Sequence, residues 1–239
     1  MAKVIPDGWR TELLAGTKAV LPILLGVIPF GLTYGVLAVG AGLPVAAAVG
    51  MSSILFAGSS QFVSIQLFSA AVPLALILLT VLIVNLRHLL YSASMAPHLR
   101  ELRLSWKVIL SYLLTDEAYV VTITHYNKAG ALINRQWYFL GAGFTMWGAW
   151  QVSTFVGVFL GTLIPSNLSL EFAVTLTFIA LLVPNLKDRP SVITAITSGI
   201  IAVIAINLPF RLNILVAAIL ALGVGLLAGR LQHKDLNRT

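Results

Sequence analysis

Four consecutive residues that weaken helices or form hydrogen bonds interrupt a long apolar stretch of the chain, and they are Gly58, Ser59, Ser60 and Gln61. A glycine in a helix interior costs about 1 kcal/mol relative to alanine, and serine hydroxyls offer the backbone competing hydrogen bonds. The cluster therefore predicts a broken helix, whose freed amides and half-helix N-terminus could bind a carboxylate. The Gln61 amide would add a further contact. A close helix–helix contact that needs small residues is the alternative explanation.

A second polar group lies in the sequence NLRHLLYSA, which begins at Asn85. Asn85, His88 and Ser92 are three and four residues apart and would share one helix face, with Arg87 and Tyr91 on a neighbouring face. A buried arginine in lipid requires a partner, and a histidine that titrates near neutral pH could carry a proton. Alternatively, the helix end has reached the interface, where Arg87 extends toward water and Tyr91 joins the aromatic belt.

The third group consists of the adjacent acids Asp116 and Glu117, which are the only acids in the apolar segment from Trp106 to His125. Adjacent side chains point about 100° apart on a helix. An acid within a membrane span is a candidate functional residue, suited to reversible protonation. The alternative is a structural ion pair, for instance between Asp116 and Arg87, and in a mixed arrangement one acid is paired while the other titrates.

The composition places these groups in a membrane protein. Of the 239 residues, 59% are hydrophobic and only 10% are charged, and the mean hydropathy is +0.96. A soluble domain of this length could not bury so much apolar surface. The apolar runs approach the roughly 20 residues that cross a hydrocarbon core about 30 Å thick, and they exclude a β-barrel, whose strands would alternate. We therefore predict an all-α, polytopic membrane helical bundle.

The net charge of +7 indicates membrane topology rather than nucleic-acid binding, because the basic residues lie in short connections between apolar segments. The sequence contains no cysteine, which excludes disulfides and thiolate nucleophiles. It also lacks a Walker-type phosphate loop, an H-E-x-x-H zinc motif and a G-x-S-x-G nucleophile motif. We therefore expect no enzyme, no catalytic residues, no cofactor and no metal site.

Apolar segments separated by short polar links organise the chain. We expect a cytoplasmic segment at residues 1–18, a transmembrane domain at 19–229 with two loosely similar halves (19–125 and 137–229), and a polar cytoplasmic tail at 230–239. The apolar segments cover residues 19–39, 44–68, 72–95, 106–125, 137–164, 168–186, 191–208 and 211–229.

Two interruptions occupy matching places in the halves, one at Gly58–Gln61 in the second segment and one at Pro184 and Asn185 in the sixth. Paired interrupted segments of this kind are typical of transporter substrate sites. If both segments are re-entrant, the basic loop after the third segment is cytoplasmic, the positive-inside rule is obeyed and the halves are inverted repeats. Arrangements in which one or both interrupted segments cross the membrane stay open.

Several stretches, in order along the chain, resemble the AzlC family, the large subunit of branched-chain amino acid exporters: VIPFGLTYG, LFAGSSQF, NLRHLLYSASMAPHL, LTDEAY and LEFAVTLTFIALLVP. The resemblance extends from Thr17 to Gly229. It implies a multi-pass protein of the bacterial inner membrane that works with a small AzlD-like membrane subunit. It also implies that the substrates are valine, leucine and isoleucine, with methionine in some members.

The resemblance and the polar groups lead to one functional expectation, a secondary transporter that exports branched-chain amino acids and is coupled to protons. A passive channel and a membrane scaffold without transport are the alternatives. The candidate substrate-binding residues are Gly58, Ser59, Ser60, Gln61, Asn85, Pro184 and Asn185. The candidate proton-coupling or ion-pair residues are Asp116, Glu117, Arg87 and His88.

Overall fold

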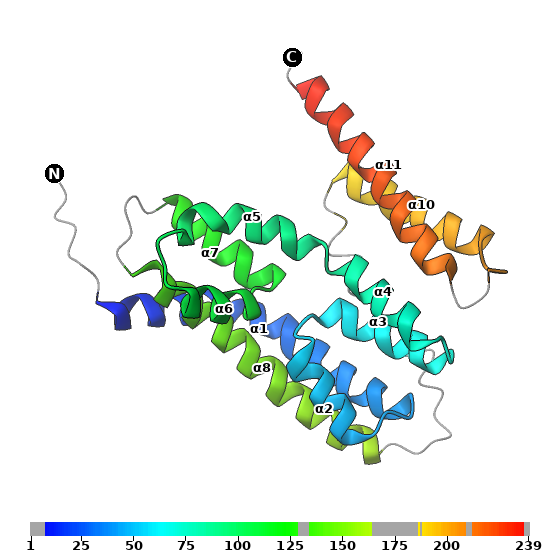
Figure 1. Cartoon of the computed structure of the whole chain (residues 1–239), viewed down its shortest axis with the longest axis horizontal. Helices are drawn as coiled ribbons and strands as arrows, with labels where there is room; N and C mark the ends of the chain where they lie inside the picture. The colour runs from blue at the N-terminus through cyan, green and yellow to red at the C-terminus, as the bar shows by residue number, and fades with distance from the viewer. Residues whose placement is uncertain (1–7, 129–133, 164–185, 187, 209–211, 237–239) are drawn as a thin grey trace. The chain divides into compact units, whose positions relative to one another are not determined.

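Every element in the part of the chain that the structure describes is a helix (Figure 1), which confirms the all-α prediction. The chain divides into two compact units, and we describe each by itself. The first unit comprises residues 1–65 and 81–165, and the second comprises residues 66–80 and 166–239. The computed structural model describes residues 8–128, 134–163, 186, 188–208 and 212–236.

Most of the described helices belong to the first unit. The end of α3 and the first part of α4 belong to the second unit, together with α10 and α11. The helices are α1 (Trp9–Gly40), α2 (Val45–Ile54), α3 (Gly58–Ser69), α4 (Leu74–Val84), α5 (Arg87–Leu99), α6 (Leu104–Tyr112), α7 (Asp116–Lys128), α8 (Arg135–Leu163), α10 (Arg189–Ile204) and α11 (Leu212–Leu236).

Three helical stretches among the described residues are long and apolar enough to cross a membrane, and they are Trp9–Gly40, Leu74–Leu99 and Leu212–Arg230. This finding supports a multi-pass membrane protein. The first stretch is α1, whose 32 residues correspond to a length of about 48 Å, more than a hydrocarbon core of about 30 Å requires. The helix therefore begins ahead of the expected apolar segment at residues 19–39 and extends beyond the hydrocarbon.

Glycines allow α1 and α8 to pack closely along their length. Gly16 of α1 lies against the backbone of Tyr138 near the start of α8, whereas Gly35 lies against Thr154 and Val158 nearer its end. Residues later in α1 contact residues later in α8, so the two helices run parallel (Figure 1). In lipid, the hydrophobic effect does not drive helices together. Close backbone packing of this kind therefore stabilises their association.

The parallel course of α1 and α8 differs from our expectation for the two halves of the chain. These helices contain the first and fifth apolar segments, which take corresponding places in the halves. Inverted repeats would orient corresponding segments in opposite directions across the membrane. The first and fifth apolar segments therefore do not have the opposite directions that inverted repeats require.

The break that we predicted in the second apolar segment is present between α2 and α3. It lies at residues 55–57, immediately before the polar cluster, so that Gly58–Gln61 form the first turn of α3 rather than the gap itself. Ala57 flanks the start of α3, because its carbonyl accepts the amide of Gln61 at 3.0 Å in the first helical hydrogen bond. The matching interruption at Pro184 and Asn185 lies outside the described residues.

The third and fourth segments are also broken, which we did not expect. The third is divided at Asn85 and Leu86 into α4 and α5, and the fourth is divided at residues 113–115 into α6 and α7. Neither position carries the glycine or proline that commonly marks a helix end.

The fourth segment forms a hairpin instead of a span. Near the start of α6, the ring of Trp106 packs against Trp137 of α8 at 4.9 Å, and near the end of α7, His125 stacks on Tyr138 at 3.8 Å. Both ends of the hairpin therefore lie beside the start of α8. Our expectation that this segment crosses the membrane was wrong, because the chain turns back at residues 113–115.

The turn of this hairpin lies beside the middle of α8. The Tyr112 hydroxyl accepts a hydrogen bond from Trp147 Nε1 at 2.7 Å, and Leu113 lies against Gly143. These contacts involve residues about thirty positions apart, which explains why local sequence signals did not reveal the turn.

In the second unit, α10 and α11 form an antiparallel pair. Asn213 Nδ2 donates to the carbonyl of Ala202 at 3.2 Å near the connection, and Gly225 lies against Thr194 farther along. Asp188 caps α10 by accepting the amide of Ser191 at 2.8 Å. The hydrogen bonds from Ser191 hold the pKa of the Asp188 carboxyl below its usual value.

The packing of α1 on α8 predicts unequal effects of two alanine substitutions on the same helix. A methyl group at Gly157 would collide with the carbonyl oxygen of Leu32, whereas one at Gly148 would point into open space. We expect Gly157→Ala to lower the free energy of unfolding by about 1–3 kcal/mol. Gly148→Ala should be neutral or slightly stabilising, because alanine favours helices. Thermal unfolding of the purified protein in detergent tests this, and equal effects would contradict the packing.

Candidate functional site

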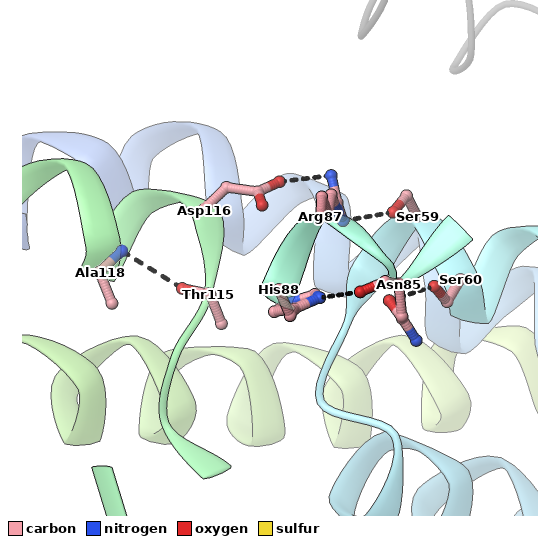
Figure 2. Close-up of polar contacts among 8 residues, drawn as sticks. All are labelled: Ser59, Ser60, Asn85, Arg87, His88, Thr115, Asp116 and Ala118. Atoms are coloured by element: carbon pink, nitrogen blue, oxygen red, sulfur yellow. Dashed lines mark hydrogen bonds and ion pairs between the residues drawn. The ribbon is translucent and has the colours of Figure 1, made fainter. Parts of the chain in front are cut away.

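Three half-helices of the first unit begin at one place, which we call the polar junction and define as Ser59, Ser60, Asn85, Arg87 and Asp116 (Figure 2). Arg87 is the first residue of α5 and Asp116 the first residue of α7, while Ser59 and Ser60 lie in the first turn of α3. Helix breaks that lie far apart in the sequence therefore meet within the fold.

Arg87 links the starts of all three half-helices. Its Nη1 donates to Asp116 Oδ2 at 2.6 Å, and its Nη2 donates to the Ser59 hydroxyl at 2.6 Å (Figure 2). The side chains of Arg87 and Asp116 are 33% and 36% exposed, so the pair is neither sealed in the core nor fully open. The structure thus contains an ion pair between Arg87 and Asp116, which we had considered as the alternative role for Asp116.

A second connection ties α3 to the break between α4 and α5. The buried hydroxyl of Ser60 donates to Asn85 Oδ1 at 2.8 Å. The backbone carbonyl of Asn85 lies 3.2 Å from His88 Nδ1, which fixes the imidazole in the first turn of α5 (Figure 2). Asn85 and His88 therefore hold the chain where α4 ends and α5 begins.

The electrostatics of the junction favour an anion. Each helix N-terminus carries roughly half a positive charge, and the first amides of a helix have no partner within it. At α7, the amide of Ala118 is capped by Thr115 Oγ1 at 3.3 Å (Figure 2). Arg87 adds a full positive charge at the start of α5, where the helix dipole disfavours it, and Asp116 offsets that charge.

Several buried polar atoms at or beside the junction have no hydrogen-bond partner among the described residues, and they are Arg87 Nε, Asp116 Oδ1 and both amide atoms of Gln61. Gln61 is fully buried. The Tyr34 hydroxyl is close enough to influence this amide, but it donates to the carbonyl of Ala48 at 2.8 Å. An unpaired buried polar group costs about 1–3 kcal/mol, so a hydrogen-bonding partner that reached these atoms would be stabilising.

An aromatic cluster adjoins the start of α3, formed by Phe30 and Tyr34 of α1, Phe62 of α3 and Trp150 of α8. Phe30 stacks on Phe62 with ring centroids 4.4 Å apart, and Tyr34 stacks on Trp150 at 6.0 Å. A Cβ atom at Gly58 would lie 3.0 Å from both Phe30 and Trp150. Glycine at this position therefore lets the backbone of α3 approach the aromatic rings.

Sequence reasoning missed this aromatic cluster. Phe30 and Tyr34 are four residues apart, a spacing that places them on one helix face and that could have drawn attention to them. Trp150 is separated from them by more than a hundred residues in the sequence. Its place in the cluster depends on the parallel packing of α1 and α8, which no local pattern predicts.

The remaining candidate residues lie at or near the junction or outside the described residues. Glu117 follows Asp116 in the first turn of α7 and forms no ion pair in the part of the chain that the structure describes. Tyr91 stacks on Tyr119 at 4.6 Å, one turn beyond the junction. Pro184 and Asn185 cannot be related to it, since neither is described.

The polar junction, its aromatic neighbours and the helices that carry them lie in the part of the chain that a known family covers. The model of the AzlC protein family matches residues 22–164, which is more than half of the chain. The chain belongs to the AzlC family. This result confirms the resemblance that we drew from the sequence motifs.

Individual relatives agree with this assignment. An uncharacterised membrane protein of Archaeoglobus fulgidus is 35% identical over 185 residues, covering 76% of this chain and 78% of that protein. The inner membrane protein YgaZ of Escherichia coli is 29% identical over 161 residues, covering 66% and 64% of the two chains. The branched-chain amino acid transport protein AzlC of Bacillus subtilis is 27% identical over 179 residues, covering 74% and 69%. No solved structure matches the chain.

The ion pair at the junction predicts strong coupling between its two members. Removing either Arg87 or Asp116 alone leaves an uncompensated charge within the membrane, whereas removing both leaves none. We expect Arg87→Met and Asp116→Asn each to lower the thermal unfolding temperature more than the double variant does. The interaction energy from this cycle should be about 0.5–3 kcal/mol. Additive effects, measured in detergent at low salt, would show that the two side chains do not interact.

Proposed function

We propose that this AzlC-family protein is a secondary transporter that exports branched-chain amino acids, namely valine, leucine, isoleucine and in addition methionine. The observation that carries the proposal is the polar junction, where three half-helix N-termini and unpaired buried polar atoms meet inside a membrane protein. Broken helices at membrane depth are tolerated where they line a cavity or are buried in protein, and transporters use them for substrates and coupling ions. The Bacillus subtilis relative is named a branched-chain amino acid transport protein.

In this proposal the starts of α3, α5 and α7 bind the polar part of the substrate. The first turn of α3, with Gly58, Ser59, Ser60 and Gln61, supplies backbone amides and side-chain donors for a carboxylate. Asn85 holds the neighbouring break open through Ser60. The aromatic cluster beside Gly58 offers an apolar surface for a branched side chain. Pro184 and Asn185 stay candidates for a contribution from the sixth segment.

Proton coupling falls most naturally to Glu117. Asp116 is held by Arg87 at 2.6 Å, so its charge is already engaged in an ion pair. Glu117 is adjacent to that pair but forms none itself among the described residues. His88, one residue beyond Arg87, is the second candidate because an imidazole titrates near neutral pH.

We further propose that the Trp9 end of the first unit faces the cytoplasm. Trp9, Trp106 and Trp137 cluster there, with ring centroids 4.8 and 4.9 Å apart, as expected of aromatic residues at a membrane interface. The same end carries a concentration of basic residues, and positive charge favours the cytoplasmic side. These residues are Arg10, Arg100, Arg103, Lys107, Lys128 and Arg135.

The cellular setting that we propose is a bacterial inner membrane, and the partner is a small AzlD-like membrane subunit. The Escherichia coli relative, which is named an inner membrane protein, supports the first part. With no Walker-type motif in the sequence, energy would come from an ion gradient. A passive channel is the main competing function, and a scaffold without transport is the other.

Counterflow of labelled leucine in proteoliposomes tests the proposed function directly. We expect vesicles with the full chain and a co-produced small subunit to exchange leucine, and a pH gradient to drive its accumulation. A channel would equilibrate leucine without accumulation under the gradient. A scaffold would produce no leucine flux with or without the small subunit, and either of these results would contradict a secondary transporter.

A charge-neutral substitution tests the coupling role of Glu117. We expect Glu117→Gln to abolish accumulation driven by a pH gradient while leucine counterflow continues, because exchange requires no net proton transfer. Glu101→Gln is a matched control, since Glu101 is an exposed acid in the connection before α6. Continued accumulation in the Glu117 variant would exclude this acid and make His88 the next candidate.

A further inference from the structure

Some hydrogen-bonding atoms of the ion pair in the polar junction have no partner among the described residues. Arg87 employs both of its terminal nitrogens, but its Nε is buried without a partner among the described residues. Asp116 accepts through Oδ2, and its Oδ1 is buried and accepts no hydrogen bond from the described residues, although the Tyr91 hydroxyl is close enough to influence the carboxylate. The pair therefore presents one unused donor and one unused acceptor of opposite charge. Each such atom is costly to bury unpaired.

These two atoms belong to two charged groups that are bonded directly to each other. The bond between Nη1 and Oδ2 is 2.6 Å long. Nε belongs to the same planar guanidinium as Nη1, and Oδ1 belongs to the same carboxylate as Oδ2. An α-amino acid carries a carboxylate and an ammonium on the same α-carbon, and it would match a donor and an acceptor that belong to paired groups of opposite charge.

We propose that Arg87 and Asp116 together recognise the zwitterionic head group of an α-amino acid. Arg87 Nε–H donates to the substrate carboxylate, and Asp116 Oδ1 accepts from the substrate ammonium. This inference rests on the proposed transport function and names the part of the substrate that the junction recognises. It assigns to the ion pair a role in specificity in addition to its structural role.

The surroundings of the pair favour this orientation of the substrate. The N-terminus of α3 lies on the Ser59 side of Arg87, where the helix dipole attracts a carboxylate. The fully buried amide of Gln61, unpaired at both atoms, lies in the same first turn of α3. The ammonium would approach the carboxylate of Asp116, which offers the opposite charge.

If the pair recognises both charges of the head group, ligands that carry only one of them should bind more weakly. A ligand with only a carboxylate would leave Asp116 Oδ1 unpaired, and a ligand with only an ammonium would leave Arg87 Nε unpaired. A hydrogen bond to a charged group contributes about 1.5–3 kcal/mol, and each 1.4 kcal/mol is a factor of about ten in affinity. Each single-charge analogue should therefore bind roughly 10- to 100-fold more weakly than leucine.

Competition binding to the full chain in lipid nanodiscs tests this statement. Labelled leucine would be displaced by leucine, by 4-methylpentanoate, which has only the carboxylate, and by 3-methylbutylamine, which has only the ammonium. We expect both analogues to be at least about tenfold weaker than leucine. If either analogue competes as well as leucine, the zwitterion assignment is overturned while the proposed transport function stands. If leucine itself does not bind, both the assignment and the proposed function fail.

Two conservative variants separate this role from a structural one. In Asp116→Asn the advantage of leucine over 4-methylpentanoate should fall by at least about tenfold, and in Arg87→Lys the advantage over 3-methylbutylamine should fall likewise. Each ratio is measured within one variant, so a loss of folded protein does not change it. Glu12→Gln is the matched control, because Glu12 is a buried carboxylate 3.3 Å from His125, away from the junction. Unchanged ratios in both junction variants would overturn the inference.

Discussion

A helix broken inside a membrane releases backbone polar groups that lipid cannot satisfy, and the first unit is organised by this constraint. Its three breaks are distributed over more than fifty residues of sequence, yet the half-helices that follow them start at one place. There Arg87 joins α5 to α3 through Ser59 and to α7 through Asp116. Polar side chains at the three breaks thus bind one another across the junction.

The parallel pair of α1 and α8 provides the rigid support that the junction requires. Glycines bring the two backbones into contact, which leaves little freedom for one helix to slide along the other. Helix α2 and the α6–α7 hairpin both attach to this pair through side chains of α8. Gln151 donates to the carbonyl of Ser52 in α2 at 3.1 Å, and Trp147 donates to Tyr112 at the end of α6 at 2.7 Å. The end of α2 and the turn of the α6–α7 hairpin are therefore positioned by α8 rather than by their own short helices.

Structural features set by residues close together in the sequence could be predicted, whereas features set by distant residues could not. Gly58 and the two serines after it weaken a helix by themselves, so the break before α3 could be anticipated. Arg87 needed an acid in an otherwise apolar region, which made Asp116 a natural partner. The turn at residues 113–115 could not be predicted, because no glycine or proline marks it and Trp147 fixes it from a distant part of the chain.

The partial exposure of the ion pair is itself informative about its use. A purely structural pair in a membrane would be stabilised by complete burial with all donors and acceptors satisfied, since unpaired polar atoms are costly in a low-dielectric interior. Arg87 and Asp116 instead stay about one-third exposed and each keeps one atom unpaired among the described residues. Positive charge at the start of α5 also opposes the helix dipole. These costs occur where the broken helices meet. A charged ligand bound at this polar site would supply the missing interactions.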